Sequence, residues 1–319
     1  MNHFLLRRVS SALGVLLVGS ILIFSLIRLI PGDPAESLAG VDASPEAVAA
    51  IRDELGLNRP AISQYFTWIA GILTLDPGRS LVIGGVIADL LADAALNTVI
   101  LTGAALLLAV GLALVLSVGT ELSDRRWVKS LSDALTTIAV AVPNFVTGTV
   151  LLIVFGVLLA LLPAGGLPRE GLFSRPDVTL QYLILPAVVL ALPVAASLTR
   201  FLNDAITREL TSSYVTTARA LGIPRRRILL TQVLPNALPP AITVLGLQIG
   251  HLLGGAVIVE ALFAWPGLGL LTQQAITGRD YPLVQVLLLL SVALFVTIQV
   301  ITDLVHARLD PRLRIGAHT

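Results

Sequence analysis

The chain has 319 residues, of which 55% are hydrophobic and only 13% are charged, whereas a soluble domain carries roughly 25% charged residues. Its mean hydropathy of +0.90 and its separated apolar blocks exclude a single soluble core and indicate an integral membrane protein. The lack of cysteine excludes disulfides, thiolate nucleophiles and Cys-based metal sites, while a net charge of +1 favours no class of partner.

The first apolar run, from Val9 to Ile27, follows Arg7 and Arg8, as the core of a secretory signal would. It is longer than the roughly 7 to 15 residues of such a core and no convincing cleavage site follows it, so we expect a retained helix. Five further stretches are long enough to cross roughly 30 Å of hydrocarbon. The six predicted spans are 9–30, 96–119, 132–161, 181–202, 239–260 and 283–305.

Six crossings place both termini on one side of the membrane. Fourteen of the 21 Lys and Arg residues fall in the two tails and in the loops 120–130 and 200–238. By the positive-inside rule we expect a multi-pass protein of the plasma or inner membrane with both termini in the cytoplasm. The predicted divisions are 1–30 (tail and first helix), 31–95 (extracytoplasmic subdomain), 96–305 (five-helix core) and 306–319 (cytoplasmic tail).

The segment 31–95 is acidic and is predicted to be a small, partly helical subdomain. Ser44 before Pro45 is typical of an N-cap followed by proline at the first helical position, and Gly56 is expected to end that helix. Its charges fit either a solvated face or a specific binding surface, and the pattern leaves both readings open.

Proline interrupts the third and fourth predicted spans, which frees backbone carbonyls and predicts helices that line a cavity. The residues are Pro143, Pro186 and Pro193. The fifth span carries glycine at every fourth position, a pattern that lets another helix approach closely. These glycines are Gly246, Gly250 and Gly254.

The inventory of reactive residues predicts no catalysis and no metal site, because no Walker-type phosphate loop and no His-Glu-x-x-His pattern occurs. Only His251 of the four histidines lies within a span, where ionisable groups are costly and commonly functional. We expect its imidazole to be neutral, hydrogen-bonded and facing the cavity, with a substrate or proton role as the alternative. Glu260 and Asp303, at helix ends, are expected to be solvated at the interface or paired there.

The loop 203–238 is too long and too polar to be a simple turn between spans. A short helix is predicted over Tyr214–Gly222, with the glycine as a left-handed C-cap. A second short helix is predicted from Arg225 to Leu234-Pro235, with three grouped arginines at its start. This outline predicts an element that docks a soluble partner.

This loop resembles the Glu-Ala-Ala loop of binding-protein-dependent ABC importer permeases, in which a glycine is followed twelve residues later by Leu-Pro. Gly222 and Leu234-Pro235 keep that spacing, and Ala218 occupies the second alanine. The departures from the pattern are Thr216 and Thr217, in place of Glu and the first Ala, and Gln232, in place of Ile.

Further stretches resemble the dipeptide and oligopeptide branch of that family, and together they cover the whole chain. They include Leu5-Leu6-Arg7-Arg8, Arg28-Leu-Ile-Pro-Gly-Asp-Pro34, Gly78-Arg-Ser80, Glu260-Ala-Leu-Phe-Ala-Trp-Pro-Gly-Leu-Gly269, Arg279-Asp-Tyr-Pro282 and Leu309-Asp-Pro-Arg312. Within the branch, the chain is similar to the permease with an extended extracytoplasmic segment after its first helix.

The resemblance implies an all-α type I permease fold of six transmembrane helices and a subunit of an ATP-driven peptide importer. The implied partners are a second homologous permease, two cytoplasmic subunits that bind ATP and Mg, an extracytoplasmic substrate-binding protein, the peptide substrate and membrane lipid. No cofactor in this chain and no nucleic acid are expected. The implied ATPase-coupling residues are Thr216, Thr217, Ala218, Arg219, Ala220, Gly222, Arg225, Leu234 and Pro235, and the candidate cavity residues are Asn144, Thr147, Gln248 and His251.

Three rival functions remain at this stage. A permease of a nickel or other small-solute importer of the same branch would share every motif above. A secondary transporter would be expected to have more spans, an internal repeat and paired intramembrane charges. An intramembrane protease would need a catalytic constellation that a solitary His251 does not offer.

Overall fold

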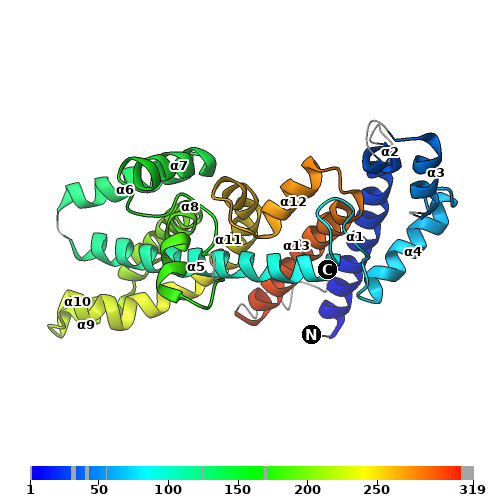
Figure 1. Cartoon of the computed structure of the whole chain (residues 1–319). Helices are drawn as coiled ribbons and strands as arrows, with labels where there is room; N and C mark the ends of the chain where they lie inside the picture. The colour runs from blue at the N-terminus through cyan, green and yellow to red at the C-terminus, as the bar shows by residue number, and fades with distance from the viewer. Residues whose placement is uncertain are drawn as a thin grey trace. The chain divides into compact units, whose positions relative to one another are not determined.

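The computed structural model describes residues 2–29, 34–39, 43–54, 56–123, 125–168 and 171–309. The elements within these ranges are helices, with one isolated bridge between Arg79 and Val86. In chain order they are α1 (Asn2–Leu29), α2 (Pro34–Ala39), α3 (Pro45–Glu54), α4 (Ala61–Leu73), α5 (Ile87–Leu122), α6 (Arg126–Ala141), α7 (Asn144–Leu151), η1 (Leu152–Leu158), α8 (Pro176–Leu210), α9 (Ser213–Ala220), α10 (Arg225–Ile228), η2 (Leu229–Val233), α11 (Leu234–Leu262), α12 (Leu268–Thr277) and α13 (Tyr281–Leu309) (Figure 1).

Within the described residues, five helices are long and apolar enough to cross a membrane. Their apolar stretches are Arg8–Leu29, Ile87–Leu122, Pro176–Leu210, Val244–Leu262 and Tyr281–Ile301. A sixth span results if the bent pair Arg126–Ala141 and Asn144–Leu158 crosses as one. Five of the six predicted spans are therefore confirmed as candidate spans, and the sixth is present if this bent pair crosses as one.

The third predicted span, 132–161, is interrupted at Pro143, as the sequence predicts, and the interruption is a sharp break. The axes of α6 and of the α7–η1 segment differ by 106°. Pro143 explains the break, since it has no N–H to donate and forces the preceding Val142 into an extended conformation, with ψ of 124°. The carbonyl of Pro143 then accepts hydrogen bonds from the N–H groups of Val146 and Thr147, which starts α7.

Proline has a different effect in the fourth span. Pro186 and Pro193 both lie inside α8, which continues for 35 residues without a break. This helix is the most buried of the candidate spans. In its apolar stretch 61% of the residues are buried, compared with 17–22% in the other candidate spans. Neighbouring helices therefore surround α8, the situation in which prolines are tolerated within a span.

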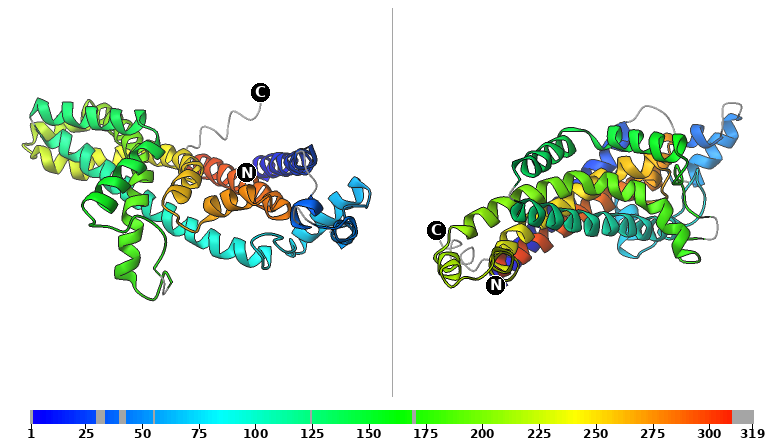
Figure 2. Two further views of the ribbon diagram at one scale, coloured as in Figure 1. Left: turned by 45° about the horizontal axis from the view of Figure 1, so that its top comes forward. Right: turned by 90° about the vertical axis from the view of Figure 1, so that its left-hand side faces the viewer.

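The chain divides into two compact units, Met1–Asn97 with Pro266–Val300, and Thr98–Trp265 with Ile301–Thr319. In the second unit, α8 packs along α11 and against α6 and α7 (Figure 2). Its apolar core takes Leu101, Ala105 and Ala109 from α5, where they recur at every fourth position and form one stripe. The core residues from α8 and α11 include Val189, Leu190, Ala191, Leu252, Ala256 and Val259.

In the first unit, α1 lies beside α13, since a Cβ atom placed on Gly19 would lie 3.5 Å from Val292 (Figure 1). The predicted start of α3 is confirmed, because Ser44 Oγ accepts a hydrogen bond from the N–H of Ala47 at 3.3 Å. The end of α3 is also as predicted, with Gly56 at a φ of +63°. Leu55 lies outside the described residues.

A loop between α4 and α5 closes onto the turn before α13. The hydroxyl of Ser80 donates to Asp280 Oδ2, and the N–H of Val82 donates to the same oxygen at 3.0 Å. Asp280 is fully buried, and its Oδ1 accepts from the N–H of Leu283 in the first turn of α13. The Asp280 carboxylate therefore accepts from the N–H of Val82 in the loop and also caps the N-terminus of α13.

Candidate functional site

The short helix α9 forms as the sequence predicts. Its C-terminus is a Schellman motif, with the N–H of Ile223 bonded to the carbonyl of Ala218 at 3.1 Å and the N–H of Gly222 bonded to that of Arg219 at 3.0 Å. Gly222 has a φ of +73°, and no heavy atom of the described residues lies within 4 Å of a Cβ atom built on it. The left-handed backbone conformation, rather than lack of space, therefore requires glycine here.

One face of α9 is fixed to the rest of the unit. Val215 and Ala218 are buried, at 0% and 4% exposure, in an apolar cluster with residues of α8 and of the chain after α9. The other members of this cluster include Leu202, Ala205, Ile206, Ile228, Leu229 and Val233. α9 therefore packs into an apolar cluster that also contains residues of α8, η2 and α11.

A polar contact adds to this attachment. Tyr214 Oη donates to Glu209 Oε2, in the last turn of α8, at 2.7 Å. Partial burial, and next the bond to Glu209, raise the pKa of the Tyr214 hydroxyl above its ordinary value. The contact joins the two helices across the Thr211–Ser212 turn.

The second predicted helix does not end at Leu234-Pro235. The chain passes from α10 through the π-helical η2 directly into α11, and the N–H of Leu234 bonds to the carbonyl of Leu229, five residues earlier. Pro235 lacks an N–H and its ring clashes with the preceding turn of an ordinary α-helix. A wider π turn before it accommodates the ring without stopping the helix.

The predicted coupling residues differ in exposure. Ala218 is buried and Leu234 half-buried, while the others are exposed: Thr216, Thr217, Arg219, Ala220, Gly222, Arg225 and Pro235. Sequence reasoning missed Leu221, whose side chain is 74% exposed beside Gly222. The sequence position of Leu221 could have predicted this exposure. Leu221 is the residue at the helix C-cap, and it does not share the helix face on which Val215 and Ala218 are buried.

Arg225 has a structural contact that the sequence did not reveal. Its guanidinium donates to the backbone carbonyl of Glu121, at the end of α5, and lies 2.8 Å from the Glu121 carboxylate. The same carboxylate lies 4.0 Å from Lys129 Nζ on α6. Arg225 therefore links α5 to the start of α10, from which the chain runs through η2 into α11 (the α10–α11 path). It is not solely a charge that could contact a partner protein.

The candidate cavity residues lie on helices of the second unit. Asn144, the first residue of α7, faces α11, because a Cβ atom on Gly255 would lie only 3.0 Å from its Nδ2 atom. Gln248 Nε2 on α11 donates to Ser197 Oγ on α8 at 2.8 Å. Thr147 is half-buried on α7. Asn144 therefore lies next to α11, and Gln248 is hydrogen-bonded to α8. Gln248 precedes His251 by one turn of α11.

His251 is exposed on α11, and no described residue is hydrogen-bonded to it. Along the same helix, no heavy atom of the described residues lies within 4 Å of a Cβ atom built on Gly250 or Gly254. The middle of α11 therefore presents a histidine and two glycines to which this part of the chain supplies no packing neighbour.

Glu260, near the end of α11, is fully buried and accepts a hydrogen bond from Thr98 Oγ1 of α5 at 2.7 Å. The reading of interfacial solvation was wrong for this residue, and the reading of pairing at a helix end is confirmed. The side chain of Asp303 lies outside the described residues.

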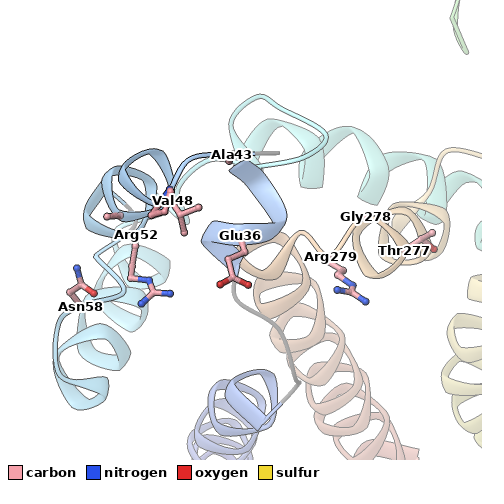
Figure 3. Close-up of a pocket in the computed structure, with 10 residues that line it drawn as sticks. Glu36, Ala43, Val48, Arg52, Asn58, Thr277, Gly278 and Arg279 are labelled. Carbon is pink, nitrogen blue, oxygen red and sulfur yellow. The ribbon is translucent and has the colours of Figure 1, made fainter. Parts of the chain in front are cut away.

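The predicted subdomain 31–95 contributes to a cleft in the first unit. It has a volume of about 1000 Å³, and Figure 3 shows Glu36 from α2, Arg52 from α3 and Arg279 extending into the same space. The remaining lining residues are Ala43, Pro45, Val48, Ala49, Asn58, Thr277 and Gly278. Two arginines and one glutamate thus line a concave surface, which the sequence pattern alone did not reveal.

Comparison with known families decides the assignment. Residues 105–315 match the family described as "Binding-protein-dependent transport system inner membrane component", and residues 1–86 match its N-terminal domain. The chain belongs to this family. It is a permease component of a binding-protein-dependent transport system, a multi-pass protein of the inner membrane.

Relatives of this permease match it from end to end. It is 33% identical over 314 residues to proteins named glutathione transport system permease protein GsiC, from Salmonella paratyphi A, Salmonella typhimurium and Escherichia coli K12. The match covers 98% of this chain and 99% of each relative.

Two solved structures share its fold. The inward-facing MetNI methionine ABC transporter matches with a TM-score of 0.56 and 19% identity, over 69% of this chain and 96% of that chain. An amino acid ABC transporter with histidines matches with a TM-score of 0.53 and 17% identity, over 69% of this chain and 94% of that one. The permease fold of ABC importers therefore describes about two thirds of this chain.

Proposed function

We propose that this permease is one of two homologous membrane subunits of an ATP-driven importer of short peptides, and that it forms half of the translocation pathway. The observation that carries the proposal is the match over 98% of the chain to permeases of glutathione, which is itself a tripeptide. Two cytoplasmic subunits would bind ATP and Mg, and a substrate-binding protein would deliver the peptide from the other side.

The exposed face of α9 would receive the ATPase. Val215 and Ala218 of this helix share an apolar cluster with residues of α8 and α11, so a displacement of α9 would move the ends of both helices. Gln248 and His251 lie on α11, and Gln248 is bonded to α8. Closure of the ATPase dimer would thereby change the spacing of the helices that carry the polar pathway residues.

The open middle of α11 would face the pathway or the second permease. Gly250 and Gly254 permit close approach of a helix, and His251 would find its hydrogen-bond partner in the peptide, in water or in that second subunit. Asn144, Thr147 and Gln248 offer amide and hydroxyl groups that suit the backbone of a peptide.

The topology proposed for this arrangement places α9, the tail residues and the 120–130 loop in the cytoplasm. The cleft of Glu36, Arg52 and Arg279 then faces the substrate-binding protein. Both signs of charge in that cleft suit the docking of a protein surface that carries complementary charges.

Transport by the complete complex tests this proposal. The permease is co-expressed with the proteins encoded beside it, purified, reconstituted into liposomes and supplied with ATP and labelled glutathione, di- and tripeptides or Ni²⁺. We expect ATP-dependent peptide uptake and no uptake of nickel. Uptake of nickel without any peptide would assign the small-solute alternative, and hydrolysis of ATP by this chain purified alone would contradict its role as a subunit without an ATPase site.

A further inference from the structure

A second cavity lies in the first unit, where the end of one candidate span lies beside the start of another. It measures about 390 Å³ and is lined by Phe24, Ile27 and Arg28 from the end of α1 and by Tyr281, Pro282 and Gln285 from the start of α13. The other side is formed by the loop before α4 and by α4 itself, including Arg59, Gln64, Thr67 and Trp68. The ends of spanning helices mark the boundary between hydrocarbon and water.

The helix α4 has the properties of a segment that lies in this boundary. Its 13 residues are too few to cross a bilayer, and they are apolar, with Ile62, Phe66 and Leu73 exposed at 63–79%. Aromatic residues attach it to α1: Tyr65 packs edge-on against Phe24 and Trp68 stacks on the same ring. Trp and Tyr are enriched at membrane interfaces, where an apolar helix can lie in the plane of the lipid headgroups.

The polar groups of the cavity are donors with unused capacity. Trp68 Nε1 and Tyr281 Oη are buried, and no described residue is hydrogen-bonded to either atom. The guanidinium of Arg28 lies 3.7 Å from the centre of the Phe24 ring and donates to Gln64 Oε1. A guanidinium has five N–H donors, so this single bond leaves capacity for a further acceptor.

The charge of the cavity is positive. Arg28 and Arg59 both line it, and none of the lining residues within the described chain is acidic. Phe24, Ile27 and Leu81 make its deeper part apolar. A matching ligand has an anionic, acceptor-rich head and an apolar body, and lies at the edge of the membrane.

We propose that this cavity binds the headgroup of an anionic phospholipid, with its phosphate beside Arg28 and Arg59 and its acyl chains along Phe24 and Ile27 of α1. Trp68 Nε1 and Tyr281 Oη donate to the phosphate and glycerol oxygens. The lipid supplies the acceptors that the two buried donors lack. It thereby fixes the subdomain after α1 to the membrane.

Fluorescence of Trp68 reports directly on the site. The chain has three tryptophans, so a variant with Trp127→Phe and Trp265→Phe retains Trp68 alone. The full chain is placed in two kinds of phosphatidylcholine nanodisc. One contains a fraction of phosphatidylglycerol brominated near the glycerol, and the other contains the same fraction of phosphatidylcholine brominated at the same position. We expect stronger quenching by brominated phosphatidylglycerol, and an added Arg28→Gln substitution to lower its apparent affinity about fivefold, the contribution of one basic group near an anionic surface.

Arg52→Gln is the matched control, because it removes the same charge from α3 in the same unit but outside this cavity. Trp265 is fully buried, so its replacement by Phe can disturb the fold. Native mass spectrometry of the chain with all tryptophans intact therefore gives a second measurement. During delipidation we expect phosphatidylglycerol to remain bound to the unsubstituted chain and to Arg52→Gln, and to be lost from Arg28→Gln.

Three outcomes would overturn the proposal. Equal quenching by the two lipids would show that the cavity has no preference for an anionic headgroup. Loss of preference in Arg52→Gln as large as in Arg28→Gln would show a diffuse charge effect. A change in Trp68 emission with inorganic phosphate alone, matching that with phosphatidylglycerol, would assign the site to a soluble anion.

Discussion

The hydroxyl of Ser80 donates to the buried carboxylate of Asp280, two residues that lie 200 positions apart in the chain. The bond joins the loop before α5 to the first turn of α13. Both residues belong to short motifs, Gly78-Arg-Ser80 and Arg279-Asp-Tyr-Pro282, which the sequence presents as unrelated. Their contact gives a structural reason for both motifs, because the Asp280 carboxylate accepts hydrogen bonds both from the loop and from the N-terminus of α13.

We predict that Asp280→Ala destabilises the permease by about 1–3 kcal/mol, because it leaves the Ser80 hydroxyl and the N–H of Val82 without their acceptor. Ser80→Ala should cost a similar amount, because the Ser80 hydroxyl both donates to Asp280 and accepts from the N–H groups of Ile83 and Gly84. Thermal unfolding in detergent measures both effects. Ser63→Ala, an exposed hydroxyl on α4, is the control, and equal melting temperatures for all three variants would contradict the role of this contact.

The conformation of Gly222 predicts opposite results for two substitutions. Gly222→Val places a β-branched residue at a φ of +73°, which costs about 1–2 kcal/mol and distorts the end of α9. We expect membrane insertion to persist while uptake and substrate-stimulated ATP hydrolysis of the complex are lost. Gly222→Asn, which tolerates this conformation, should retain most of the uptake. Equal activity of the two variants would show that the backbone at this position does not matter for coupling.

The pair of Glu121 and Arg225 is a test of how α5 is linked to the α10–α11 path. Arg225 is half-exposed, with its side chain at 47%, so we expect each of Glu121→Gln and Arg225→Gln to cost only about 0.5 kcal/mol. The double variant should lose less than the sum of the two single ones, because both single substitutions remove the same ion pair, while the bond of Arg225 to the Glu121 carbonyl is lost only with Arg225. Denaturant unfolding measures the cycle, and additive losses would show that the two residues act separately.

His251 can be tested for proton transfer. No described residue is bonded to it, so no proton relay within this part of the chain leads to or from the imidazole. We predict that His251→Gln changes the rate of peptide uptake but leaves the shape of its profile between about pH 5.5 and 7.5 unaltered. Loss of the pH dependence in this variant, measured in proteoliposomes of the complete complex, would instead assign a proton role.

The elements that the sequence predicted best have strong local causes. The spans follow from long apolar runs, and the caps of α3 and α9 follow from Ser44 and Gly222. The breaks were harder, because proline has a context-dependent effect. Pro143 ends α6, whereas Pro186 lies within α8, the most buried of the candidate spans. Only the packing of neighbours distinguishes the two cases.

Contacts between distant residues were beyond the reach of the sequence pattern. The bond of Thr98 to Glu260 and the pair of Glu121 and Arg225 each join residues more than 100 positions apart. Composition and periodicity describe one element at a time and give no partner for a buried charge.

The central claim is that α9 is the contact through which ATP hydrolysis drives this permease. Because the chain has no cysteine, Thr217→Cys introduces a unique thiol on the exposed face of α9, and Ser63→Cys on α4 introduces a matched control. In the reconstituted complex, we expect Thr217→Cys to cross-link to a single cysteine on the ATPase subunit, with a yield that changes when ATP is bound. Absence of this cross-link in a complex that still imports peptide, or equal cross-linking from Ser63→Cys, would contradict the account.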